Sequence, residues 1–229
     1  IWSSSYKAIQ ICNQYLAEFQ GLTFDELKLN DDYRAQMFRY TNSFKEARFL
    51  RAYFYFNLVR AYGDVPYFTE MVTTDQVNSL TRTPAQEIFN AIIAECDKLS
   101  TELPADYTKL GLDGIAPAEN GRVTCYAALA LKARAALYAA SPLFNPENNK
   151  DLWRRAAEAN KEVIETCTAN GFKLSKYSEL WGPNNWSNNE MIFVRRYNGN
   201  ISTLEEYNFP MGVPGGNSGN CPTQNMVDA

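Results

Sequence analysis

One segment limits the possible folds of this chain more than any other. Residues 45–68 read KEARFLRAYFYFNLVRAYGDVPYF and hold eight aromatic rings in twenty-four residues. Apolar side chains occupy almost every face of a helix drawn through this segment, which predicts a helix buried on several sides. Three cations, Arg48, Arg51 and Arg60, interrupt the aromatic residues, and we expect them to pair with acids or to lie along grooves.

The ends of this helix carry recognisable signals. Ser43 and Glu46 have the spacing of a capping box, in which each side chain bonds the backbone of the other. Gly63 fits the position after the last helical residue, and Pro66 prevents the helix from continuing. We therefore expect a helix over 44–62.

Apolar residues at helical spacing predict further helices. Thr83 and Gln86 form a second capping-box pattern with Pro84 at the first helical position, before a regular stripe that ends near Leu99. An alanine-rich helix is expected after Thr124. The other expected helices lie at about 6–19, 32–40 and 151–168, the last with Trp153, Ala156, Ala157, Asn160, Val163 and Ile164 on its inner face.

The spacing of the helices indicates how they pack. Helix starts near 44, 84 and 124 are about 40 residues apart, which is typical of stacked helical hairpins. The predicted fold is mainly α, a tetratricopeptide-like helical-hairpin solenoid with long loops and little strand. Residues 1–171 are the expected helical scaffold, and 172–229 an irregular, loop-rich segment of the same domain. The sequence MIFVRRY at 191–197 is the one convincing strand pattern.

Composition excludes several classes of function. The chain of 229 residues contains no histidine, which excludes Ser–His and Cys–His nucleophiles and every imidazole metal site. Its five cysteines form no Cys-x-x-Cys pair, so neither a zinc ribbon nor a redox motif is indicated, and no cofactor is expected. The net charge is −4 without a basic tract, so no nucleic-acid partner is expected. The apolar stretch 125–144 contains Lys132 and Arg134 and is too charged to span lipid.

Four segments carry a family resemblance. The stretch EARFLRAYFYFNLVRAYGDVPYF resembles the hallmark segment of the SusD/RagB family of nutrient-binding outer-membrane lipoproteins. Three further segments are similar to family motifs in the same order: IWSSSYKAIQICNQYL, GRVTCYAALALKARAALYAASPLFN and CPTQNMVDA. Family members begin with a lipoprotein signal and continue past this last motif. The resemblance therefore implies that the chain is the central portion of a longer protein.

The resemblance also implies a function. It implies a non-catalytic SusD-like protein of polysaccharide utilisation that binds oligosaccharides at the cell surface. The protein would be held at the outer membrane by an N-terminal lipid anchor and would deliver its ligand to a SusC-like TonB-dependent transporter. The hallmark segment would mark the scaffold, with four rings between the stacked helix pairs: Phe49, Tyr53, Phe54 and Phe56.

Sugar rings present a C–H face and a rim of hydroxyls, so a glycan site needs exposed aromatic rings beside amides or charged groups. The segment YSELWGPNNWSNNE has this mixture, and its candidate ligand-binding residues are Tyr177, Trp181, Asn184, Asn185 and Trp186, together with Asn188 and Asn189. Alternatively, its tryptophans pack beneath the helices. The loop 67–82 is a second candidate through Tyr67, Gln76 and Asn78, and the loop 106–121 a third.

Two other functions stay open from the residues. A tetratricopeptide-like adaptor would bind a peptide or protein ligand in its groove. A glycoside hydrolase would need two carboxyl groups about 5–9 Å apart. The adjacent pairs Asp31–Asp32 and Glu205–Glu206 are more typical of solvated charges, so an enzyme is not expected.

Overall fold

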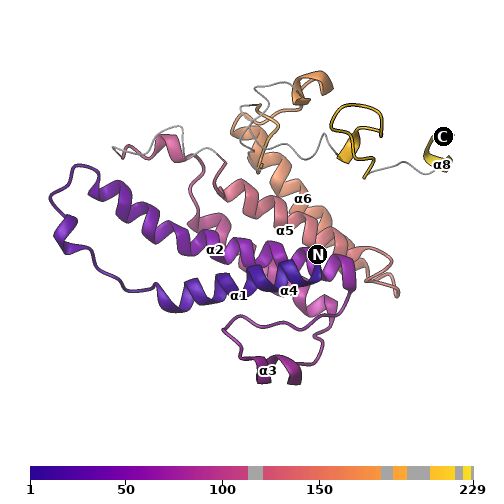
Figure 1. Ribbon diagram of the computed structural model, residues 1–229, viewed down its shortest axis with the longest axis horizontal. Coiled ribbons are helices and arrows are strands. Elements are labelled where there is room, and N and C mark those ends of the chain that lie inside the picture. Colours follow the sequence, from indigo (N-terminus) through magenta and orange to yellow (C-terminus); the bar gives the residue numbers. More distant parts are fainter. Residues whose placement is uncertain (113–120, 182–187, 195–206, 220–223, 228–229) are drawn as a thin grey trace. The chain divides into compact units, whose positions relative to one another are not determined.

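The computed structural model describes residues 1–112, 121–181, 188–194, 207–219 and 224–227. The chain forms two units, residues 1–194 and 195–229, and the first carries the helical core. Its helices (Figure 1) are α1 (Trp2–Glu18), α2 (Tyr33–Tyr62), α3 (Thr74–Ser79), α4 (Ala85–Glu102), α5 (Cys125–Ala140) and α6 (Lys150–Ala169). Among the described residues, short 3-10 helices lie at η1 (Asp25–Leu27), η2 (Tyr107–Lys109) and η4 (Tyr177–Trp181). In the second unit, α8 covers Gln224–Val227.

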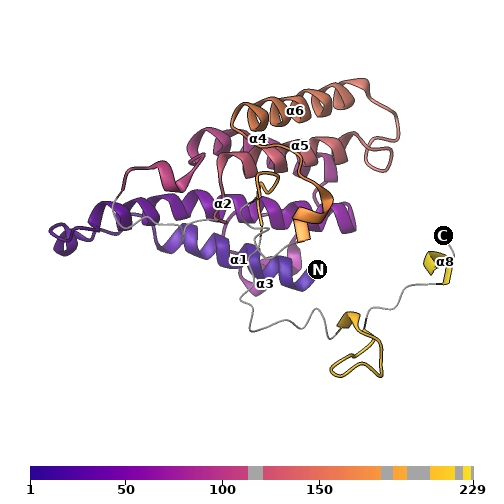
Figure 2. The ribbon, with the colours of Figure 1, turned by 90° about the horizontal axis from the view of Figure 1, so that it is seen from above.

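The five long helices form a stack. α1 packs on α2, α2 on α4, α4 on α5 and α5 on α6. Figure 2 shows α1 and α2 on one side of the stack and α6 on the other, with α4 and α5 between them. Among the described residues, the one β interaction is an isolated antiparallel bridge between Val65 and Thr83. The expected mainly α fold, built from helices packed on their chain neighbours, is confirmed.

The aromatic segment lies at the centre of this stack. Phe49, Tyr55 and Phe56 are no more than 1% exposed, while Tyr53 and Phe54 are half-buried against the same core. Burying one such ring stabilises the fold by about 2–3 kcal/mol relative to leaving it in water. The prediction of a helix buried on several sides is confirmed.

The arginines of this helix follow the expectation too. Arg48 joins α2 to α4, because its Nε lies 2.7 Å from Glu95 Oε1 and its Nη1 2.7 Å from Glu102 Oε2. The guanidinium of Arg60 lies over the ring of Phe56, 5.7 Å from its centroid. Because arginine has a long apolar stem, the stem can pack on the core while the charged guanidinium group lies outside it.

The start of this helix differs from the prediction. α2 runs unbroken for 30 residues from Tyr33, so the helices expected on either side of Ser43 are one, and the capping box is wrong. Ser43 lies inside the helix, where its Oγ donates to Tyr40 O (2.6 Å) and lies 2.6 Å from the hydroxyl of Tyr15 on α1. The ring of Phe44 stacks on Tyr15 at 5.2 Å, so packing against α1 continues across the position where a break was expected.

The turn after α2 also caps the next helix. Gly63 ends α2 as expected, with φ of 70°. The capping box at Thr83 is wrong, because the backbone N–H of Thr83 donates to Val65 O at 2.9 Å and Pro84 precedes the helix rather than starting it. The acceptor at the start of α4 is Asp64, whose Oδ1 receives the N–H of Ala85 at 2.8 Å. A carboxylate at this end also complements the helix dipole.

Two expectations near the end of the first unit need correction. Of the inner face expected for α6, Ala156 is buried but Ile164 is 65% exposed, and the remaining buried residues of α6 are Ala159 and Cys167. Alanines dominate here because α5 and α6 meet through small residues. The strand expected at 191–197 is wrong for its described part, because Met191 N donates to Asn188 O in a turn and the described chain supplies no partner strand.

Candidate ligand-binding cleft

The Trp/Asn-rich segment is only partly described. Tyr177 begins η4 and its side chain is 75% exposed, so its ring has an open face. Trp181 is the last residue of η4, and its side chain lies outside the described part. Asn184, Asn185 and Trp186 also lie outside the described residues.

The second candidate loop is divided between the core and the surface. The ring of Tyr67 lies 4.6 Å from that of Tyr55 and is half-buried. Burial raises the pKa of the Tyr67 hydroxyl, which is the behaviour of a ring packed on the core. Thr73 and Gln76 form a capping box at the start of α3. The Thr-x-x-Gln spacing in the sequence is the signal for this cap. Asn78 is exposed on the same short helix.

A large cleft of the first unit is lined by described residues of the third candidate loop, 106–110 and Gly121, and by the end of the Trp/Asn-rich segment. Its volume is about 780 Å³, within the ~300–1,000 Å³ of ordinary ligand sites. The loop around η2, the start of α5, the end of α6 and the turn at 188–194 surround it. Its polar lining residues are Asp106, Thr108, Lys109, Arg122, Thr124, Asn170, Asn188 and Asn189, and its apolar ones include Leu110, Phe172 and Ile192.

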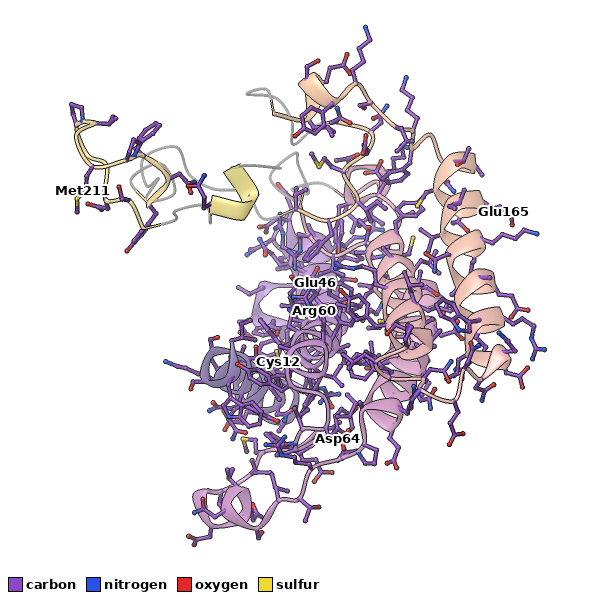
Figure 3. The ribbon with its side chains drawn as sticks, turned by 90° about the vertical axis from the view of Figure 1, so that its right-hand side faces the viewer. Cys12, Glu46, Arg60, Asp64, Glu165 and Met211 are labelled. Carbon is purple, nitrogen blue, oxygen red and sulfur yellow. The ribbon has the colours of Figure 1, made fainter. Side chains whose placement is uncertain are left out.

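A buried polar network supports the base of this cleft. The carboxylate of Glu46, on α2 in the middle of the stack (Figure 3), accepts hydrogen bonds from Arg122 Nε and Nη2, both at 2.8 Å. Its Oε1 also accepts from the Asn42 amide and the Tyr107 hydroxyl, each at 2.8 Å. The Arg122 guanidinium lies 5.6 Å from the centroid of the Tyr107 ring. Burial first, and then the charge of Glu46, raises the pKa of Tyr107 well above its usual range.

One rim of the cleft is a locally fixed loop. Asp106 Oδ1 accepts from the Thr108 hydroxyl at 2.6 Å and from its backbone N–H at 2.9 Å. Lys109 Nζ lies 3.3 Å from the other carboxylate oxygen. The Thr108 hydroxyl is the main cause that lowers the pKa of Asp106, so this carboxylate is ionised at neutral pH. The rim therefore offers a carboxylate, a hydroxyl and an ammonium group to a ligand.

Another part of the lining belongs to the Trp/Asn-rich segment. Asn188 Oδ1 accepts from the Ser175 hydroxyl at 2.7 Å and from Glu190 N at 2.8 Å, and Ser175 N donates to Glu190 Oε2 at 2.8 Å. These bonds join Ser175, two residues before the segment, to the end of the segment. Asn189 is exposed beside them and lines the cleft. Two of the asparagines selected from the sequence thus lie at the cleft, whereas Arg122 stood in a family-like segment but was not selected as a site residue.

The described residues suit hydrogen bonding better than catalysis or metal binding. Asp106 is the one carboxylate among the described residues that line the cleft. The described part of the chain holds no cluster of three or more Cys, Asp or Glu side chains that could bind a metal ion. Within the same residues, no helix combines the length and apolar character needed to cross a membrane.

Comparisons with known proteins agree with this architecture. Two SusD-like proteins of Formosa agariphila are 25% and 26% identical over 149 and 206 residues, which are 65% and 88% of this chain. The chain spans only 24% and 34% of their lengths. A SusD-like carbohydrate-binding protein of Bacteroides fragilis superposes with a TM-score of 0.63 at 27% identity, over 84% of this chain and 32% of that one.

Further comparisons identify the family. A laminarin-binding SusD-like protein superposes with a TM-score of 0.61 at 27% identity, over 84% of this chain and 36% of that one. The family model of SusD-like proteins, described as starch-binding and associating with the outer membrane, matches residues 1–137. That match covers more than half of the 229 residues. The chain belongs to the SusD-like family.

Proposed function

We propose that the chain recognises an oligosaccharide nutrient without acting on it chemically. The observation that carries this proposal is the cleft between η2 and the turn at 188–194, in a member of a family described as starch-binding. Solved relatives include proteins described as carbohydrate-binding and laminarin-binding. Both the family and the chemistry of the cleft therefore favour a glycan.

The groups around the cleft match the hydroxyl rim of a sugar chain. Asn189 supplies an amide that can both donate and accept, Thr108 a hydroxyl and Lys109 a cation. These groups line an opening of about 780 Å³, which is large enough for more than one sugar ring. Because Glu46 fixes Arg122 and Tyr107 beneath them, the polar base of the cleft is held in place before a ligand arrives.

The same lining argues against hydrolysis. Cleavage of a glycosidic bond needs a general acid and a second carboxyl group about 5–9 Å away. The described residues of the cleft supply Asp106 alone, and the Thr108 hydroxyl and Lys109 hold it in its ionised form. An ionised carboxylate cannot act as the general acid, so binding without cleavage is the function that we propose.

The proposal extends to the whole protein. We infer delivery of the bound glycan to a SusC-like TonB-dependent transporter, and exposure at the cell surface through a lipid anchor. The family's association with the outer membrane supports both inferences. Anchor and transporter contacts would belong to the complete protein, since the chain spans at most 34% of the curated relatives that it matches.

Isothermal titration of the intact protein with an oligosaccharide panel that includes laminarin fragments tests this proposal. We expect Asn189→Ala to weaken binding at least fivefold, because it removes an exposed amide from the cleft. Asn30→Ala removes an exposed amide from the 25–33 loop and should leave the affinity unchanged. Binding of peptides in place of all glycans would favour the adaptor function. New reducing ends after incubation with polysaccharide would show an enzyme.

A further inference from the structure

A second pocket lies between the first turns of α1 and the loop at 66–80. Its volume is about 450 Å³, and it shares no lining residue with the cleft. Seven of its ten lining residues are apolar or aromatic: Trp2, Tyr6, Pro66, Phe68, Val72, Val77 and Leu80. The polar ones are Ser3, Gln10 and Asn78. Nothing in the proposed cleft function uses this pocket.

The aromatic wall of the pocket is held in place by the protein itself. The Trp2 and Tyr6 rings meet edge to face, with centroids 5.0 Å apart. Tyr6 stacks on Phe68 with centroids 5.9 Å apart and planes 14° apart. The Tyr6 hydroxyl donates to Pro66 O at 2.8 Å, and burial raises its pKa to about 12. Fixed rings can receive a ligand without ordering their side chains on binding.

The outer wall is built by α3. The capping box between Thr73 and Gln76 fixes the start of this short helix, which Figure 1 shows in the loop that leaves the helix stack between α2 and α4. Val77 and Asn78 on this helix are exposed and line the same pocket as the rings. The capped helix therefore presents an apolar side chain and an amide at the pocket mouth.

The polar groups of the pocket are uncharged. Ser3 and Asn78 are exposed at its edge. The Gln10 amide nitrogen lies 3.5 Å from Val72 O, and its Oε1 is buried without a hydrogen-bond partner in the described structure. No charged side chain is among the ten lining residues. A carboxylate, sulfate or ammonium group would therefore lose hydration here without gaining a counter-ion among these ten residues.

We propose that this pocket is a second carbohydrate site, which takes one neutral pyranose ring. The C–H face of the ring lies against the aromatic wall formed by Trp2, Tyr6 and Phe68. Its hydroxyl edge lies at the mouth, within reach of the Ser3 hydroxyl and the Asn78 amide and open to water. The choice of a sugar as ligand rests on the proposed function, whereas the preference for a neutral ring rests on the lining residues alone.

The Trp2 indole offers a direct readout of occupancy. The chain has four tryptophans, so it contributes four indole N–H signals to a ¹H–¹⁵N spectrum of the intact protein, one of them from Trp2. We expect methyl β-glucoside and laminarin fragments to shift the Trp2 signal saturably. Methyl glucuronide, which carries a carboxylate, should bind this pocket at least tenfold more weakly. Indole serves as an apolar probe of the same pocket.

Matched variants of α3 test the location. Val77→Lys places a long charged side chain at the pocket mouth and should weaken the sugar-induced shift of Trp2 at least tenfold. Ser79→Lys adds the same charge on the same helix outside the pocket lining and should leave it unchanged. Both substitutions replace exposed residues of a short surface helix, so both variants are expected to fold. Their circular dichroism spectra check this.

The possible outcomes separate this inference from the cleft function. If glycans bind with an affinity that depends on Asn189 while the Trp2 signal stays unmoved, the second site is refuted and the cleft stands. If the Trp2 signal shifts saturably with sugar in Asn189→Ala protein, the second site stands whether or not the cleft binds. If indole shifts Trp2 and no sugar does, the pocket takes apolar groups and our assignment of the ligand is wrong.

Discussion

The partly buried carboxylate of Glu46 should control both the stability of the first unit and the shape of the cleft. Four donor atoms point at its two oxygens, each at 2.8 Å: Arg122 Nε and Nη2, Asn42 Nδ2 and the Tyr107 hydroxyl. The substitution Glu46→Gln keeps the size of the side chain but leaves one acceptor oxygen. The new amide group then directs its own hydrogens at donors of Arg122.

The magnitude follows from these contacts. The Glu46 and Arg122 side chains are only 15% and 26% exposed, so water screens them weakly. Removing one partner of a fully buried ion pair costs about 3–5 kcal/mol, and glutamine retains part of the hydrogen bonding. We therefore expect Glu46→Gln to lower the free energy of unfolding by about 2–3 kcal/mol. For a unit of about 150–250 residues that unfolds cooperatively, that corresponds to a fall in Tm of about 5–10 °C.

Urea denaturation of the intact protein measures this change, and Glu165→Gln is the matched control. Glu165 lies on the outer side of α6 (Figure 3), with a side chain 67% exposed and 3.6 Å from Lys161 Nζ. An exposed pair of this kind is worth at most about 1 kcal/mol, and we expect a change below about 0.5 kcal/mol. Equal stability of the two variants would refute the view that the Glu46 network holds the base of the cleft together.

Three further predictions concern the scaffold. Phe56→Ala removes a fully buried ring and should cost about 3–5 kcal/mol by chemical denaturation, while Leu174→Ala, at a residue 87% exposed, should change stability by less than about 0.5 kcal/mol. In Gly63→Ala, the added Cβ meets no atom within 4 Å. Because φ is 70° and ψ is −127° at this position, the substitution should still lower the free energy of unfolding by about 1–3 kcal/mol in the same assay. Unchanged stability would contradict the strained turn. Burial raises the pKa of Cys96 from 9.0 to about 12 and that of Tyr6 from 10.0 to about 12. The free energy of unfolding should therefore be at its full value below about pH 9 and fall by up to about 1.4 kcal/mol per pH unit for each group as the pH rises toward 12. Cys96→Ala should reduce that slope. A free energy of unfolding that stays constant to pH 11 would contradict the burial of these groups.

The sequence predicts helices well where their apolar stripe is regular. The helix after Thr124 and the one near 151–168 are α5 and α6, because alanine-rich or periodic segments need only a neighbouring helix to form. Both predicted capping boxes fail for a tertiary reason. Ser43 lies where contacts with α1 keep the helix continuous, and the N–H at the start of α4 is bonded by Asp64 from the preceding turn.

The candidate site is predicted only in part, for a similar reason. The clustering of aromatics and amides in sequence indicated the segment that contributes Asn188 and Asn189 to the cleft. The base of the cleft joins Glu46, Tyr107 and Arg122, which are distant in sequence and meet only when α2, η2 and the start of α5 pack together. No local pattern specifies such a meeting, so the sequence alone did not reveal it.

The central claim is that the helices form an inert scaffold and that the segments between them bind the ligand. Hydrogen–deuterium exchange of the intact protein, with and without a saturating glycan ligand, tests this claim most directly. The account predicts new protection at 104–110 and 188–194, with unchanged exchange in the buried turns of α2, α4 and α5. Protection confined to those helices, with none in either segment, would contradict it.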